Sequence, residues 1–213
     1  MLAIFIGSYL IGSIPVGYLI VRKKADVDIL KSGSHRSGGF NAFVVTDSKV
    51  VGILVGVLDA LKGLVPVLLA GLIFHQSFLH ACMALFGAII GHNYPIWTKF
   101  KGGRGLATAA GGMFILGFSF AIIWCLIWVV TKVALKRDIL VANLTAIFLT
   151  PLLIWSLPWE WVNGFVAASL DHWTFIFFSC ILSMILLLSH YDVVQEVWKG
   201  SPKEHPDKTS QQS

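Results

Sequence analysis

Charge is scarce in this chain. Only 13% of its 213 residues are Asp, Glu, Lys or Arg, while 56% are hydrophobic, and the mean hydropathy is +0.79. A soluble globular domain carries about 25% charged residues, and a core of this size has no room for so much apolar surface. The composition therefore excludes a water-soluble domain. It predicts an all-α, polytopic membrane protein with no separate soluble module.

Cysteine is also rare. The three cysteines lie inside apolar runs without the spacing of metal ligands, and the seven histidines show no metal-binding spacing either. We therefore expect buried, inert thiols, no metal and no cofactor. The net charge of +5 does not indicate a nucleic-acid partner, because the cations lie between apolar runs and not along one face.

The N-terminal apolar run has no cations in front of it. Residues 1–20 are apolar, and Arg22, Lys23 and Lys24 follow them. A cleaved signal peptide has its charges in front and a small-residue cleavage site behind. We therefore expect a retained first span, kinked at Pro15, with its N-terminus outside the cell.

The apolar runs predict about seven transmembrane helices. The stretch 105–133 is too long for one span of ~20 residues and short for two. Two crossings with a turn near Gly117 place all flanking cations on one side, as the positive-inside rule requires. The first of the two helices is then short or re-entrant. The predicted spans are 2–21, 50–74, 78–97, 105–116, 117–133, 139–157 and 172–189.

This topology predicts the location of the protein. Fifteen of the sixteen cations fall on the inner side, which implies a plasma (inner) membrane protein of a bacterium with a cytoplasmic C-terminus. Residues 1–201 then form the membrane domain, and residues 202–213 form a disordered cytoplasmic tail.

The second span contains both an acid and a base. Asp59 and Lys62 are three residues apart, so on a helix they share a face and can pair. Charges within a span are costly and usually face protein or a wet cavity. Two interpretations stay open, a structural ion pair and a part in a polar site.

Residues 91–108 form the most distinctive motif, G-H-N-Y-P-I-W-T-K-F-K-G-G-R-G-L-A-T. Cations beside a glycine-rich turn that opens a helix have the outline of a phosphate-binding site, with the helix dipole adding positive potential. The spacing is not that of a Walker loop. The alternative is a basic loop at the membrane surface.

The motif resembles that of the bacterial acyl-phosphate:glycerol-3-phosphate acyltransferases, which are integral membrane enzymes of phospholipid biosynthesis. The shared pattern is G-H-x-x-P-x-x-x-x-F-K-G-G-[KR]-G-x-A-T, and L-D-x-L-K-G at 58–63 also matches. The resemblance spans residues 1–204. It implies transfer of an acyl group from acyl phosphate to glycerol 3-phosphate, giving lysophosphatidic acid without coenzyme A or acyl-carrier protein.

The inner segments and the resemblance together predict the site. His190, Ser34 and Lys101 are the candidate catalytic residues, with His190 orienting or deprotonating the acceptor hydroxyl; the rival base is the phosphate of the donor. No Ser/His/Asp order suggests an acyl-enzyme, so we expect direct transfer. The candidate substrate- and phosphate-binding residues, including the backbone N–H groups of two glycines, are Arg36, Asn41, Lys62, His92, Lys101, Gly102, Gly103, Arg104 and Gly105.

The chain departs from the family pattern in two places. The first loop of the family resembles G-S-G-N-x-G-A-T-N-x-x-R, and here Arg36, Phe40 and Val44 replace its first Asn, its Thr and its Arg. The C-terminal pattern H-R-x-N-I keeps His190 but has Val193 at the Asn position. These losses leave two alternatives open, an inactive or repurposed relative that binds lipid phosphates and a small membrane transporter. The expected partners are the bilayer and the two substrates. The sequence does not indicate an oligomeric state.

Overall fold

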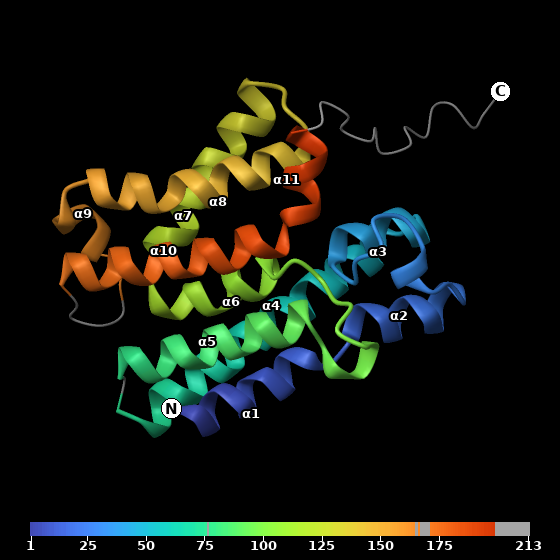
Figure 1. The fold of residues 1–213 in the computed structure, drawn as a ribbon, viewed down its shortest axis with the longest axis horizontal. Helices are drawn as coiled ribbons and strands as arrows, with labels where there is room; N and C mark the ends of the chain where they lie inside the picture. Colours follow the sequence, from blue (N-terminus) through green and yellow to red (C-terminus); the bar gives the residue numbers. More distant parts are fainter. Residues whose placement is uncertain (76, 165, 167–170, 199–213) are drawn as a thin grey trace.

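The computed structural model describes residues 1–75, 77–164, 166 and 171–198, and the regular structure in these ranges is helical (Figure 1). In chain order the helices are α1 (Leu2–Ser13), α2 (Val16–Ala25), η1 (Ile29–Lys31), α3 (Gly39–Thr46), α4 (Lys49–Ile73), α5 (Phe78–Asn93), η2 (Ile96–Thr98), α6 (Leu106–Leu116), α7 (Phe118–Val129), the π-helical turn η3 (Val130–Ala134), α8 (Ile139–Ser156), α9 (Trp159–Asn163), α10 (His172–Ser189) and α11 (Tyr191–Trp198).

The helices confirm a polytopic membrane protein. Within the described ranges, four helical segments are long and apolar enough to cross a bilayer: α1 with α2, then α4, α8 and α10. Their outer faces carry large exposed apolar side chains, among them Leu72, Phe148 and Phe177. In water such faces would be unstable, whereas lipid tails solvate them. Pro15 interrupts the first segment between α1 and α2, as predicted, because proline has no N–H to donate.

Small residues set the spacing between helices. A side chain on Gly12 of α1 would overlap the backbone of Ala88 in α5, and one on Gly63 of α4 would overlap the backbone of Thr108 in α6. Lipid tails are as apolar as leucine, so membrane helices gain most from this close approach of backbones. Gly7, another glycine of α1, has open space beside it and makes no such contact.

The chain reverses at Gly117, as predicted. Its N–H donates to the carbonyl of Met113 at the end of α6, and Gly117 also forms an isolated bridge with Val166. With 11 residues, α6 spans about 16 Å, roughly half of the ~30 Å hydrocarbon layer. Gly105, which precedes α6, is buried, so the start of α6 lies inside the protein.

One predicted boundary is wrong, and two polar segments contain helices that the sequence analysis did not predict. The third span ends at Asn93 and not near residue 97, because the residue before Pro95 is disfavoured in the α region. The polar segment 22–49 contains helix α3, which packs over α2, η1 and α4 on a small core that includes Val21, Ile29 and Val55. The chain after Ser189 continues as helix α11. The predicted tail from residue 202 lies outside the described residues.

These additional helices gather at one end of the bundle. Figure 1 shows α2, α3, the loop before α6 and α11 at the same end, while the turn between α4 and α5 and helix α9 lie at the other. The predicted phosphate-binding motif therefore meets the first polar segment and the start of α11 in space.

Candidate active site

A cavity of about 470 Å³ opens at this end of the bundle. Its walls come from the loop before α3, from helices α3, α4, α5, α6 and α8, and from the residues just before α6 and just after α10. The predicted site residues that line it are Ser34, Arg36, Asn41, His92, Arg104, Gly105 and His190. The topology thus brings together residues that lie more than 150 positions apart in the sequence.

Helix N-termini converge on the cavity. The first residues of α3, α6 and α8 line it: Gly39 and Phe40, Leu106 and Ala107, and Ile139 and Leu140. The first N–H groups of a helix have no partner within that helix, and its dipole places partial positive charge there. The sequence analysis predicted such a positive helix end only at the glycine-rich motif, where α6 begins. The Asp138 carboxylate already accepts the Leu140 N–H at the start of α8, whereas the starts of α3 and α6 have no side-chain cap and favour an anionic ligand.

Asn41 organises the first loop. Its Nδ2 donates to the carbonyls of Ile29, Ser32 and Arg36 at 2.8–3.3 Å, and its Oδ1 accepts the N–H of Ser34 at 2.9 Å. The predicted binding role is therefore corrected, because the loop backbone already uses this amide. Asn41 instead holds Ser34 and Arg36 at the cavity.

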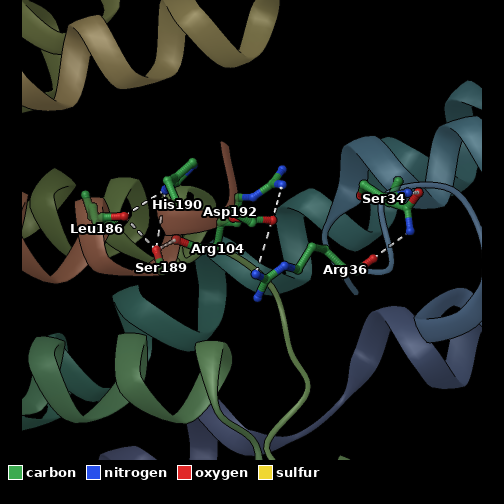
Figure 2. Close-up of polar contacts among 8 residues, drawn as sticks. Ser34, Arg36, Arg104, Leu186, Ser189, His190 and Asp192 are labelled. Atoms are coloured by element: carbon green, nitrogen blue, oxygen red, sulfur yellow. Dashed lines mark hydrogen bonds and ion pairs between the residues drawn. The ribbon is translucent and has the colours of Figure 1, made fainter. Parts of the chain in front are cut away.

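Arg36 and Arg104 meet at one carboxylate. Nη2 of Arg36 lies 3.2 Å and Nη2 of Arg104 lies 2.9 Å from Oδ2 of Asp192 (Figure 2). Burial raises the pKa of Asp192, but the two guanidinium groups outweigh this and hold the pKa below its usual value. Asp192 is therefore ionised at neutral pH. The sequence interpretation missed it because it compared the neighbouring position, Val193, with the family pattern.

His190 presents an acceptor to the cavity. Its Nδ1–H donates to the carbonyl of Leu186 at 2.7 Å, which leaves Nε2 unprotonated. That Nε2 atom is buried and has no hydrogen-bond partner among the described residues. The hydroxyl of Ser189, next to it, lies within hydrogen-bond distance of two carbonyls, that of Leu186 at 2.7 Å and that of Arg104 at 2.9 Å, and so places the motif loop against the end of α10.

Burial holds the pKa of His190 at about 4, below its ordinary 6.5. We expect the imidazole to stay neutral and to add no inflection to the rate between about pH 6 and 8. Between 6.5 and about 4 the unfolded chain binds a proton that the folded chain does not, so stability falls as the pH falls.

Thermal unfolding and rate profiles of the parent and His190→Gln test this prediction. The variant should lose less stability over that acidic range. An inflection near pH 6.5 in the parent rate that disappears in the variant would contradict it.

A buried charged cluster lies beneath the motif. Nζ of Lys62 donates to Oδ1 of Asp59 at 2.8 Å, which confirms that the two side chains pair, and Nδ1 of His92 lies 3.4 Å from the same oxygen. Asp59 and His92 line the cavity, whereas Lys62, a predicted binding residue, does not. Lys62 therefore reaches the site only through Asp59.

Gly103 packs against His92. Its N–H donates to the His92 carbonyl at 3.1 Å, and a side chain at position 103 would overlap the imidazole. This corrects the prediction that the Gly103 N–H binds phosphate, since the protein itself uses that donor. Neither Gly103 nor Gly102 lines the cavity; the Gly102 carbonyl accepts the N–H of Ser37 at 3.3 Å and joins the two loops.

Lys101 is not brought to the cavity. It is exposed and does not line the cavity in the described structure, and its carbonyl accepts the Thr98 hydroxyl at 2.7 Å. Arg104 therefore supplies the cation that this motif presents to the cavity. Two further polar residues line the cavity that the sequence did not indicate. They are Lys49, at the start of α4, and Asn143, whose amide oxygen accepts the indole N–H of Trp128 at 2.8 Å.

Among the described residues, no three His, Cys, Asp or Glu side chains gather as a metal site would require. The fold and the site together define an integral membrane protein of α-helices with a cavity at one end of the bundle that Arg36, Lys49 and Arg104 line. The chain belongs to the glycerol-3-phosphate acyltransferase family, whose sequence profile matches residues 2–200. The predicted resemblance is confirmed, and with it the enzyme class, an acyltransferase.

Individual relatives agree with this assignment. The chain is 33% identical over 198 residues to a glycerol-3-phosphate acyltransferase of Bradyrhizobium diazoefficiens, covering 93% of this chain and 91% of the relative. A glycerol-3-phosphate acyltransferase of Thermotoga petrophila is 33% identical over 196 residues, which cover 92% of this chain and 92% of the relative. The crystal structure of PlsY, an integral membrane glycerol 3-phosphate acyltransferase, in its glycerol 3-phosphate form, superposes with a TM-score of 0.76 at 30% identity, covering 93% of this chain and 92% of that one. The lysophosphatidic acid form gives 0.75 at the same identity and coverage.

Proposed function

We propose that this chain transfers a fatty acyl group from acyl phosphate to a hydroxyl of glycerol 3-phosphate. The acceptor oxygen forms the new ester bond to the acyl carbon, the bond from that carbon to the phosphate oxygen breaks, and the products are lysophosphatidic acid and phosphate. The observation that carries the proposal is the cavity, where Arg36, Arg104 and three helix N-termini converge. The two PlsY crystal forms, with glycerol 3-phosphate and with lysophosphatidic acid, support the choice of acceptor and product.

The acyl chain would enter an apolar cavity next to the site. A second, smaller cavity of about 80 Å³ lies among α6, α7 and α10, lined by side chains such as Met113, Phe120 and Trp124, and Leu106 lines both cavities. A phosphate bound at the start of α6 would therefore lie beside an apolar cavity. This arrangement suits a substrate with an anionic head and an apolar tail.

His190 acts on the acceptor hydroxyl by orientation. Its unprotonated Nε2 can accept the hydroxyl hydrogen bond. With a pKa of about 4 it is a weak base at neutral pH, and the leaving phosphate is the better proton acceptor. The proposal therefore assigns His190 to binding and the proton to the donor phosphate, while the arginines stabilise the charge that develops.

The departures from the family pattern do not remove the cations from the cavity. Val44 stands where the family has an arginine, but Arg36 lines the cavity next to Arg104. The proposal therefore retains two guanidinium groups for phosphate. Phe40, at the family's Thr position, also lines the cavity and adds apolar surface there.

The test is a phosphate-release assay on purified protein given acyl phosphate, with and without glycerol 3-phosphate, and with lysophosphatidic acid measured directly. We expect release to depend on the acceptor and to match product formation one to one. Binding of acyl phosphate or lysophosphatidic acid without transfer would contradict the proposal and identify a lipid-phosphate-binding relative instead.

We also propose seven crossings of a bacterial inner membrane, with the N-terminus outside and the C-terminus cytoplasmic. The shorter apolar helices α6 and α7 with η3, together with α5, would complete the spans that the four longer segments begin. Single cysteines at positions 99 and 136 in a cysteine-free parent should then react with a membrane-impermeant reagent only after the cells are opened. Labelling of these two positions from opposite sides would contradict the two crossings of 105–133.

A further inference from the structure

Asp192 lies behind the two arginines of the cavity. One carboxylate oxygen accepts from both guanidinium groups, at 3.2 Å from Arg36 and 2.9 Å from Arg104. Both arginines line the cavity, whereas Asp192 is not among its lining residues in the described part of the chain. The carboxylate therefore contacts the guanidinium groups from outside the cavity lining, and Figure 2 shows both side chains meeting at it.

This arrangement offsets a repulsion. Two guanidinium groups that share a site repel each other, and in a partly dry site that repulsion is larger than in water. A single carboxylate between them brings the net charge of the three groups to +1, while most of their N–H donors stay available. Nε of Arg104 is buried and has no hydrogen-bond partner among the described residues, so one donor awaits an acceptor.

The partnership joins the two segments in which the chain departs from its family pattern. Arg36 stands at an asparagine position of the first loop, and Asp192 follows His190 in a C-terminal pattern that has lost its own asparagine at Val193. In the fold these segments touch through the Arg36–Asp192 ion pair. A cation that is new to the first loop has its counterion in the other altered segment.

We propose that Asp192 is a positioning residue that braces Arg36 and Arg104 side by side, so that both guanidinium groups bind one substrate phosphoryl group. This inference rests on the proposed function for the identity of the substrate. The phosphoryl group belongs to either the donor or the acceptor, and both present the same oxygens to the arginines. Asp192 itself does not touch the substrate.

The test measures KM for each substrate at saturating concentration of the other, for the parent, Asp192→Asn and Asp192→Glu. Because a hydrogen bond to a charged group is worth about 1.5–3 kcal/mol, losing one arginine's alignment should raise one KM about ten- to a hundredfold. The turnover number should also fall, because the same arginines stabilise the charge that develops, but by less than in Arg104→Ala, since both guanidinium groups remain and only their alignment is lost. The glutamate variant should recover most of the affinity, and the substrate whose KM rises identifies the phosphoryl group.

A double-mutant comparison shows whether Asp192 acts through Arg36. The combined Arg36→Gln/Asp192→Asn variant should raise KM by less than the product of the two single effects. Glu160→Gln is the matched control, because it removes one exposed carboxylate from α9, at the other end of the bundle, and should leave both KM values unchanged.

Two results would overturn the inference. Unchanged KM values with a lower thermal midpoint in Asp192→Asn would show a carboxylate that only stabilises α11. A lower KM would show that the carboxylate competes with phosphate. If the parent transfers no acyl group, the proposed function fails. The positioning role of Asp192 is then tested by calorimetry, which compares the binding of glycerol 3-phosphate and of inorganic phosphate to the parent and to Asp192→Asn. Weaker binding to the asparagine variant supports positioning, and equal binding rejects it.

Discussion

Replacing Arg104 with alanine is expected to lower acyl transfer by about 10²–10³-fold, the loss typical of removing one preorganised donor from a site where negative charge develops. Arg104 combines the features such a donor needs. It lines the cavity, immediately precedes Gly105 at the start of α6, and is held in place by Asp192 and by the Ser189 hydroxyl on its carbonyl. Its loss removes a charge and its geometry together.

Initial rates of purified variants, with yield and thermal midpoint beside them, check this prediction. Arg104→Lys should recover only part of the rate, because an ammonium group cannot reproduce the planar fork of a guanidinium. Arg137→Ala is the matched control, since it removes the same side chain from an exposed position outside the cavity lining.

Lys101→Ala separates the structural assignment from the sequence-based one. Because Lys101 is exposed and does not line the cavity, its loss should cost less than that of Arg104. If Arg104→Ala folds and turns over like the parent, the phosphate-binding role of this motif is wrong.

Replacing Asp59 with alanine is expected to destabilise the protein by about 3–5 kcal/mol, because it leaves the ammonium group of Lys62 buried without its counterion. Both side chains are buried in α4, 2.8 Å apart, and a charge left alone within a membrane-spanning helix is costly. The imidazole of His92 would lose the same partner.

Yield and thermal unfolding in detergent measure this loss, with a charge-neutral double variant as the control. Asp59→Ala/Lys62→Met removes both charges together and should recover most of the stability lost by Asp59→Ala alone. Asp59 also lines the cavity. If Asp59→Asn keeps the parent's yield and midpoint but loses turnover, the carboxylate takes part in the reaction and the ion pair is not primarily structural.

Local sequence patterns predicted the long helices, the main chain breaks, one ion pair and the family. A hydrocarbon layer of fixed thickness demands about 20 apolar residues per crossing, so hydropathy located the long helices α4, α8 and α10 to within a few residues. Local rules also placed the break at Pro15, the reversal at Gly117 and the pairing of Asp59 with Lys62, since a helix puts residues three apart on one face. The glycine-rich motif identified the family because its spacing lies within one continuous segment.

Tertiary structure decided how the motif is used. Helices α3 and α11 are short and are stabilised by packing that their own sequences do not contain, so the sequence analysis did not predict them. The Gly103 N–H and the Asn41 amide form hydrogen bonds with the protein backbone, and Lys101 does not line the cavity.

Asp192 shows the reason most clearly. It lies 88 positions from Arg104 along the chain and 2.9 Å from it in space. Hydropathy, turn preference and motif spacing are properties of neighbouring residues. The assignment of a donor to an acceptor depends on which distant segments the packed helices bring together, and only the folded structure determines that.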